Sequence, residues 1–189
     1  CLIAGPRGRV GVMRKVNPIA RELRRFTPGR EFPVFRVAGC RMGVATCADA
    51  SYFETFRLLA LRGAEVIFAP HANSLGAYGN CRDGWFRWRM ENWPYFTRTC
   101  CVAVAGMSCA GRRARPRAGE AVLKYCSGGL VMDWTGRPLA RLRGRDKREG
   151  LLAAEIDLAG LRAARKKRER TFNAGAVYNR RGGWLWGAY

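Results

Sequence analysis

The segment from Val34 to Pro70 constrains the fold more than any other part of this sequence. Within it, Met42–Thr46 is a short run of small and apolar residues, which is typical of a buried strand. A second such run, Glu65–Ala69, ends at Pro70. The residues between the two runs are long enough for one helix. The segment therefore predicts a β-α-β unit and a layered α/β fold with a mixed sheet.

The helix between the two strands carries start and stop signals. Ser51 and Glu54 stand in the S-x-x-E relation of a capping box, which predicts that the helix begins near Tyr52. Gly63 is a natural C-terminal stop. The apolar face of this helix is expected to consist of Phe56, Leu59 and Ala60.

Cys47 follows the first strand directly and precedes the helix. Functional side chains in α/β sheets commonly lie at such a strand end. Backbone N–H groups and the positive end of the helix would favour a thiolate there and hold a developing oxyanion. The alternative is that Cys47 is a small buried side chain like other cysteines.

The eight cysteines show no metal or disulfide pattern. None forms a C-x-x-C pair and the chain has one histidine, which argues against a zinc site. Without a secretion signal, we expect them to lie mostly buried in a reducing compartment. They are Cys1, Cys40, Cys47, Cys81, Cys100, Cys101, Cys109 and Cys126.

The chain is strongly basic, with 35 basic and 14 acidic residues and a net charge of +21. Such a charge suggests nucleic-acid binding, and residues 162–170 form a dense basic patch. No nucleic-acid-binding motif accompanies the arginines, which are spread along the whole chain. Nonspecific binding to polyanions is therefore favoured over specific recognition. No apolar run is long enough to span a membrane.

Hairpins, strands and helices are predicted on both sides of the β-α-β unit. Asn17 is expected to cap a short helix with Pro18 at its first position, and Ile19, Leu23 and Phe26 on one face. Further strands are predicted at Cys1–Ala4, Val10–Val16, Phe32–Val37, Cys100–Ala105, Leu123–Met132, Pro138–Leu142 and Leu151–Ile156. Helices are predicted at residues 85–93 and 158–170, and residues 111–119 form a basic loop.

Lys15 and Glu22 are candidate partners for Cys47. The chain has five lysines among its 35 basic residues, so a lysine at the end of a strand suggests a need for a compact ammonium group. The alternatives are that Lys15 is a solvated strand-end lysine and that Glu22 neutralises neighbouring arginines. A cysteine nucleophile also needs a proton acceptor. His71 would serve in a thiol-protease arrangement, whereas a glutamate and a lysine together form the other solution.

The lysine, glutamate and cysteine lie in contexts that resemble the nitrilase, or carbon–nitrogen hydrolase, superfamily, with a weaker likeness to aliphatic amidases. The resemblance covers almost the whole chain. The matching stretches are Met13–Pro18, Glu22–Gly29, Gly39–Gly43, Cys47–Glu54, Arg57, Arg62–Glu65, Ser127–Gly136, Arg180–Arg181 and Tyr189.

The resemblance implies an α-β-β-α sandwich and hydrolysis of non-peptide C–N bonds, in amides or nitriles, through a thioester to Cys47. It implies that Lys15 stabilises the oxyanion together with the backbone N–H of Ala48, and that Glu22 is a supporting glutamate. It further implies a cytoplasmic homo-oligomer without metal or organic cofactor. Residues 1–189 would form a single partial domain, with residues 170–189 as a tail at a subunit interface.

Three features depart from the family pattern. No residue matches the general-base glutamate, which the family places on an early strand. Phe53 stands where the family usually has proline, and the usual asparagine is absent from Gly106–Ser108. Because the chain begins at Cys1, we expect a fragment that lacks the first strand–helix units and has little activity alone.

Two other functions are compatible with the sequence. A catalytically inactive relative would use the sandwich as a binding or assembly module. A basic nucleic-acid-binding protein would use the positive charge.

Overall fold

The computed structural model describes residues 1–71, 101–106, 128–143 and 150–171. The predicted aromatic helix at 85–93, the basic loop at 111–119 and residues 172–189 of the predicted tail lie outside these residues. In the described part of the chain, none of the helices combines the length and the apolar character needed to cross a bilayer.

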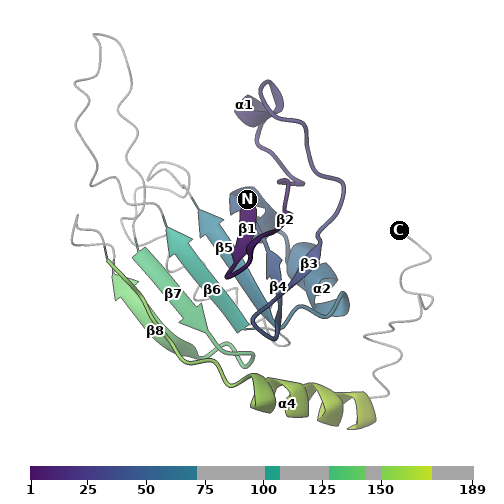
Figure 1. The fold of residues 1–189 in the computed structure, drawn as a ribbon, viewed down its shortest axis with the longest axis vertical. Helices are drawn as coiled ribbons and strands as arrows, with labels where there is room; N and C mark the ends of the chain where they lie inside the picture. Colours follow the sequence, from purple (N-terminus) through teal and green to yellow (C-terminus); the bar gives the residue numbers. More distant parts are fainter. Residues whose placement is uncertain (72–100, 107–127, 144–149, 172–189) are drawn as a thin grey trace.

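The centre of the structure is a six-stranded sheet with the order β3-β4-β5-β6-β7-β8 (Figure 1). The middle strands β4, β5 and β6 run parallel, and the outer pairs are antiparallel. The predicted β-α-β unit and mixed sheet are therefore confirmed. The strands are β3 (Val34–Val37), β4 (Cys40–Val44), β5 (Val66–His71), β6 (Cys101–Gly106), β7 (Gly128–Met132) and β8 (Pro138–Arg143).

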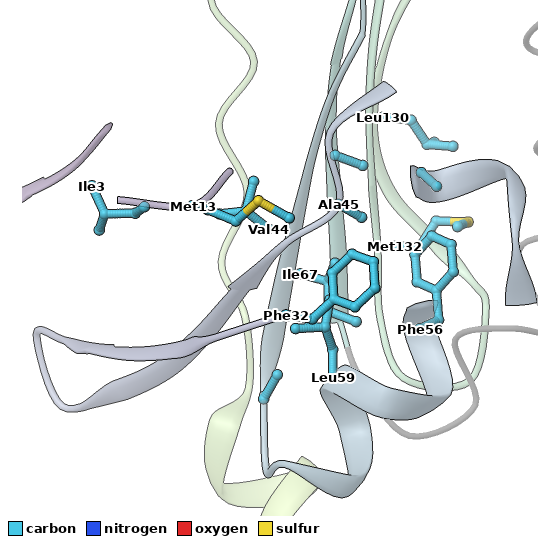
Figure 2. Packing of buried hydrophobic residues seen from close by; sticks show 13 residues of the cluster. Ile3, Met13, Phe32, Val44, Ala45, Phe56, Leu59, Ile67, Leu130 and Met132 are labelled. Atoms are coloured by element: carbon cyan, nitrogen blue, oxygen red, sulfur yellow. The ribbon is translucent and has the colours of Figure 1, made fainter. Parts of the chain in front are cut away.

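The predicted N-terminal hairpin is present as β1 (Leu2–Gly5) and β2 (Gly8–Val12), paired antiparallel. Figure 2 shows Ile3 and Met13 on one side of the sheet strands, and Phe56 and Leu59 on the other. All four side chains are buried in one apolar cluster. The described core therefore has a hairpin on one face of the sheet and a helix on the other.

The helix on the second face is α2 (Phe53–Leu61). It packs closely on β4, because a Cβ atom at Gly43 would lie 2.6 Å from Leu59 Cδ2. Gly63 follows the C-cap residue of α2 and has a φ of +88°, so the predicted helix stop at this glycine is confirmed. The predicted capping box is wrong: the N-cap residue is Tyr52, without a side-chain cap bond, because Ser51 still belongs to the preceding 3-10 helix.

Several strand predictions need correction. The strand predicted at Val10–Val16 ends at Val12, so Lys15 lies beyond it. The strand predicted at Met42–Thr46 is β4, which begins at Cys40 and ends at Val44.

Two further corrections concern the segments that follow. β5 does not end at Ala69 but continues through Pro70 to His71, since its neighbour β6 pairs with it over the whole length. Residues 151–156 form no strand: Leu151 is 92% exposed, and Ile156 packs instead against the small cluster around Leu161.

The C-terminal helix α4 (Leu158–Thr171) confirms the helix predicted at 158–170. Figure 1 shows α4 across one end of the sheet, opposite the end where the short helix α1 (Ala20–Leu23) lies. Leu161 of α4 is fully buried and packs with Val66 at the start of β5. Arg165 also donates a hydrogen bond to the carbonyl of Ala64.

Glu65 is the buried polar group that ties α4 to the sheet. Its side chain is 3% exposed. Arg162 of α4 donates to it through Nε at 2.6 Å and Nη2 at 3.2 Å, and the backbone N–H of Arg41 donates at 2.8 Å. The hydrogen bond from Arg162 is the largest influence and, with the Arg41 N–H and both positive charges, lowers the pKa of Glu65 to about 2 against the opposing effect of burial.

Replacement of Glu65 by glutamine should destabilise the chain. At neutral pH, we expect Glu65→Gln to lower the free energy of unfolding by about 1–3 kcal/mol, because charge-assisted hydrogen bonds to a half-exposed arginine are lost. The folded pKa lies below the ordinary value of 4.5, so the wild-type contribution is complete above about pH 4.5 and is lost as the pH falls toward about 2. Urea unfolding at a series of pH values measures both effects.

Glu31 provides a matched control for Glu65. Its side chain is 68% exposed and lies 3.8 Å from Arg62, so Glu31→Gln should change stability little. Equal losses in both variants, or an unchanged acid dependence in Glu65→Gln, would contradict the proposed anchoring of α4.

Candidate functional site

Cys47 lies just past the end of β4, where it begins the 3-10 helix η1 (Cys47–Ser51). Its φ is +52°, a left-handed value that costs energy for a residue with a side chain. The thiol is half-buried and in no disulfide. The predicted location at a strand end is confirmed. However, the helix that starts here is η1, because α2 begins only at Phe53.

Lys15 and Glu22 are in direct contact. Lys15 follows β2, Glu22 belongs to α1, and the Lys15 Nζ and Glu22 Oε2 atoms lie 2.5 Å apart. Their side chains are only 15% and 32% exposed. The alternative of a solvated lysine is therefore wrong, and the partner of Glu22 is Lys15.

Glu22 has a second role as the cap of its own helix. Its Oε2 atom also accepts the backbone N–H of Ile19 at 2.8 Å. Burial alone would raise the pKa of Glu22. The hydrogen bonds from Lys15 and Ile19, with the Lys15 charge, outweigh burial and hold that pKa below its ordinary value. The charged form of Glu22, which pairs with the Lys15 ammonium group, is thus favoured.

Asn17 does not cap α1, contrary to the prediction. The N-cap is Ile19, and Pro18 lies before it and not at the first helical position. The Glu22 side chain already occupies the Ile19 N–H, so Asn17 is left to bond elsewhere. The expected apolar face is exposed as well, at 54% for Ile19, 56% for Leu23 and 64% for Phe26.

Asn17 instead bonds Asp49, a fully buried residue of η1. The Asp49 Oδ1 atom accepts the backbone N–H of Asn17 at 2.7 Å and its Nδ2 group at 3.1 Å. The Oδ2 atom accepts the backbone N–H of Val16 at 3.4 Å. Asp49 therefore joins the segment that carries Lys15 to the helix that begins at Cys47.

A backbone bond closes the loop between β2 and β3. The N–H of Gly29 donates to the carbonyl of Lys15 at 2.8 Å. A Cβ atom at Gly29 would lie 2.5 Å from the Arg14 carbonyl oxygen, so only glycine permits this approach. The backbone at Lys15 is thus held at Gly29 and, two residues later, at Asp49.

Sequence reasoning missed Asp49. The available signal was an acidic residue two positions after the candidate nucleophile, within the small residues of Cys47–Ser51. Ala48, the predicted backbone donor, is the second residue of η1. His71, the predicted alternative base, ends β5 on the strand next to β4 and is 5% exposed.

A metal site has no support within residues that the structure describes. These residues include no group of three or more histidine, cysteine, aspartate or glutamate side chains able to hold a metal ion.

Curated proteins similar to this chain include amidases and nitrilases. It is 30% identical over 167 residues to an (R)-stereoselective amidase of a Pseudomonas species, covering 87% of this chain and 54% of the relative. It is 26% identical over 157 residues to a probable nitrilase of Schizosaccharomyces pombe, covering 82% and 51%. The chain thus spans about half the length of the curated relatives that it matches.

Solved structures show a similar fold. A carbon–nitrogen hydrolase from Helicobacter pylori G27 superposes with a TM-score of 0.65 at 22% identity, covering 88% of this chain and 59% of the other. A variant of the amidase from Nesterenkonia sp. AN1 has a TM-score of 0.60 at 23% identity, covering 86% and 57%. That structure shows covalent addition of the acetamide moiety of fluoroacetamide at the active-site cysteine.

A family model supplies the assignment. The carbon–nitrogen hydrolase model matches residues 1–166, which include Lys15, Glu22 and Cys47. The chain belongs to the carbon–nitrogen hydrolase family, the nitrilase superfamily, as its lysine and cysteine motifs indicated.

Proposed function

We propose that this chain carries the nucleophile and the oxyanion-binding groups of an amidase-type carbon–nitrogen hydrolase. The observation that carries the proposal is the Lys15–Glu22 ion pair. Asp49, in the helix that begins at Cys47, accepts hydrogen bonds from the segment that carries Lys15. Because several of the relatives are named amidases, we propose an amide and not a nitrile as the substrate.

In the proposed reaction, the Cys47 sulfur attacks the amide carbonyl carbon and the thiol proton passes to a carboxylate base. No residue of this sequence matches that base. The carbonyl oxygen becomes an oxyanion, which Lys15 and the Ala48 N–H stabilise. The C–N bond then breaks, and the nitrogen leaves as ammonia or an amine with the transferred proton. Water attacks the thioester, which releases the carboxylic acid and restores the thiol.

Glu22 serves this reaction through Lys15. A lysine side chain has a flexible four-carbon stem, so its ammonium group would otherwise sample many positions. The 2.5 Å contact with a partly buried carboxylate, itself fixed by the Ile19 N–H, limits that freedom. An ammonium group oriented before the oxyanion forms loses less energy to reorganisation when the charge develops.

The hairpin side of the sheet supports the α-β-β-α sandwich. Phe68 of β5 is 43% exposed and Leu2 of β1 is 68% exposed. An open, mostly apolar hollow of about 290 Å³ lies between the hairpin and strands β4 and β5. A further layer over this face would bury these side chains. A single domain, homo-oligomers, a cytoplasmic location and a tail at a subunit interface remain part of the proposal.

Fluoroacetamide tests the proposed nucleophile without requiring turnover. We expect it to add an acetamide group to Cys47 faster than to the other cysteines. Trypsin should release residues 42–57, in which Cys47 is the single cysteine, so mass spectrometry of this peptide measures the reaction. Labelling of Cys47 no faster than that of Cys40, in peptide 37–41, would contradict the proposal.

The Lys15–Glu22 pair gives a second prediction. Titration of the Glu22 carboxyl carbon by NMR should show a midpoint below that of an ordinary glutamate, and Lys15→Met should raise it, because the ammonium hydrogen bond and charge are lost. Acid should therefore remove the contribution of this pair to stability only as the pH falls below the ordinary glutamate range.

Arg137→Met is the control for the Glu22 titration. It removes the same charge from the turn between β7 and β8, away from α1. A similar shift of the Glu22 midpoint in both variants would mean that net charge, and not the Lys15 contact, sets the pKa.

A further inference from the structure

We propose that Asp49 is a positioning residue that holds Lys15 in working position relative to Cys47. This inference rests on the proposed function, because it assumes that Lys15 acts on chemistry at Cys47. Asp49 is a fully buried polar residue at the site for which the reaction above has no use.

The placement of Asp49 in the chain links both candidate residues. It shares the short helix η1 with Cys47 and lies two residues after it. The groups that it binds, the N–H of Val16 and the N–H and Nδ2 of Asn17, follow Lys15 directly. A shift of Asp49 relative to these donors would therefore change the position of Lys15 relative to Cys47.

The chemistry of the side chain suits this task. A carboxyl group offers two acceptor oxygens, and here they receive three N–H donors. These partly buried donors would lose their acceptor if the side chain were removed, which destabilises the contact. The contacts are also independent of the Lys15 side chain, whose partner is Glu22. Asp49 thus fixes the backbone at Lys15, and Glu22 fixes the ammonium group.

A purely structural role would make Asp49 important for stability alone. A positioning role predicts something further: replacement of Asp49 should change the reactivity of Cys47, and only while Lys15 is present. The distinction calls for a double-mutant cycle on thiol reactivity, measured where every variant is folded.

The measurement is the rate of Cys47 alkylation by iodoacetamide across a pH series, read from the tryptic peptide 42–57. Cys40, in peptide 37–41, is the internal reference. Burial and the neighbouring Glu65 raise the pKa of the Cys40 thiol, so that its alkylation should stay slow unless the fold opens.

The variants are Asp49→Asn, Lys15→Met and the double variant. Asparagine keeps the size of the side chain but replaces one acceptor oxygen with an NH₂ group, which faces the donors of Val16 or Asn17. Loss of the Lys15 ammonium group should displace the pH–rate profile to slower rates. We expect roughly tenfold slower alkylation of Cys47 in Lys15→Met, because the group that would bind the carbonyl oxygen of the reagent is lost.

The proposal predicts that Asp49→Asn displaces the profile in the same direction as Lys15→Met and adds no displacement in the Lys15→Met background. An unchanged profile in Asp49→Asn, or an equal displacement in both backgrounds, overturns it. If Lys15→Met itself leaves the profile unchanged, the proposed function fails and the inference falls with it. A failure of the inference alone is recognised because Lys15→Met still shifts the profile.

Asn17→Ala keeps the test decisive if Asp49→Asn does not fold. It deletes only the 3.1 Å side-chain bond and leaves both backbone donors in place. We expect a smaller displacement in the same direction, again absent without Lys15. A profile identical to the wild type would contradict positioning through the Asp49–Asn17 contact.

Discussion

The candidate site depends on one buried carboxyl group, that of Asp49. Lys15 follows strand β2 of the hairpin, whereas Cys47 follows strand β4 of the central sheet. The two candidate residues are therefore positioned by separate sheets. Asp49 bridges them by accepting the N–H groups of Val16 and Asn17. Because these donors are partly buried and Asp49 is fully buried, breaking the bridge costs free energy. Cooperation between thiol and ammonium groups requires such a connection between independently formed parts.

A second buried carboxyl group, that of Glu65, joins another segment of the chain to the opposite end of the sheet. β4 and β5 are parallel, so Glu65, just before β5, and Asp49, just after β4, lie at opposite ends of the strands. Glu65 binds Arg162 and fastens α4, whereas Asp49 fastens the Lys15 segment. The helix α4 therefore lies at the end of the sheet opposite the candidate site (Figure 1). Nonspecific polyanion binding by its basic residues stays a prediction from net charge.

The sequence predicted most where side-chain pattern and local structure agree. The strand before Cys47 and the helix stop at Gly63 could be predicted because strand and helix-end signals are local in the sequence. Asp49 could not be found this way, since its partners lie more than thirty residues away. The α1 cap was missed because a side chain from within the helix, Glu22, bonds Ile19. The strand predicted from Leu151 is wrong because only the end of this apolar run, at Ile156, packs against the cluster around Leu161, whereas Leu151 is exposed.

NMR of the lysine side chains tests the central claim most directly. The chain has five lysines, so the ¹³Cε signal of Lys15 can be assigned by its absence in Lys15→Met. Alkylation of Cys47 should shift the Lys15 signal and leave those of Lys166 and Lys167 on α4 in place, with no such shift in an identically treated Cys47→Ser variant. A Lys15 signal that does not respond to alkylation of Cys47 would contradict the account.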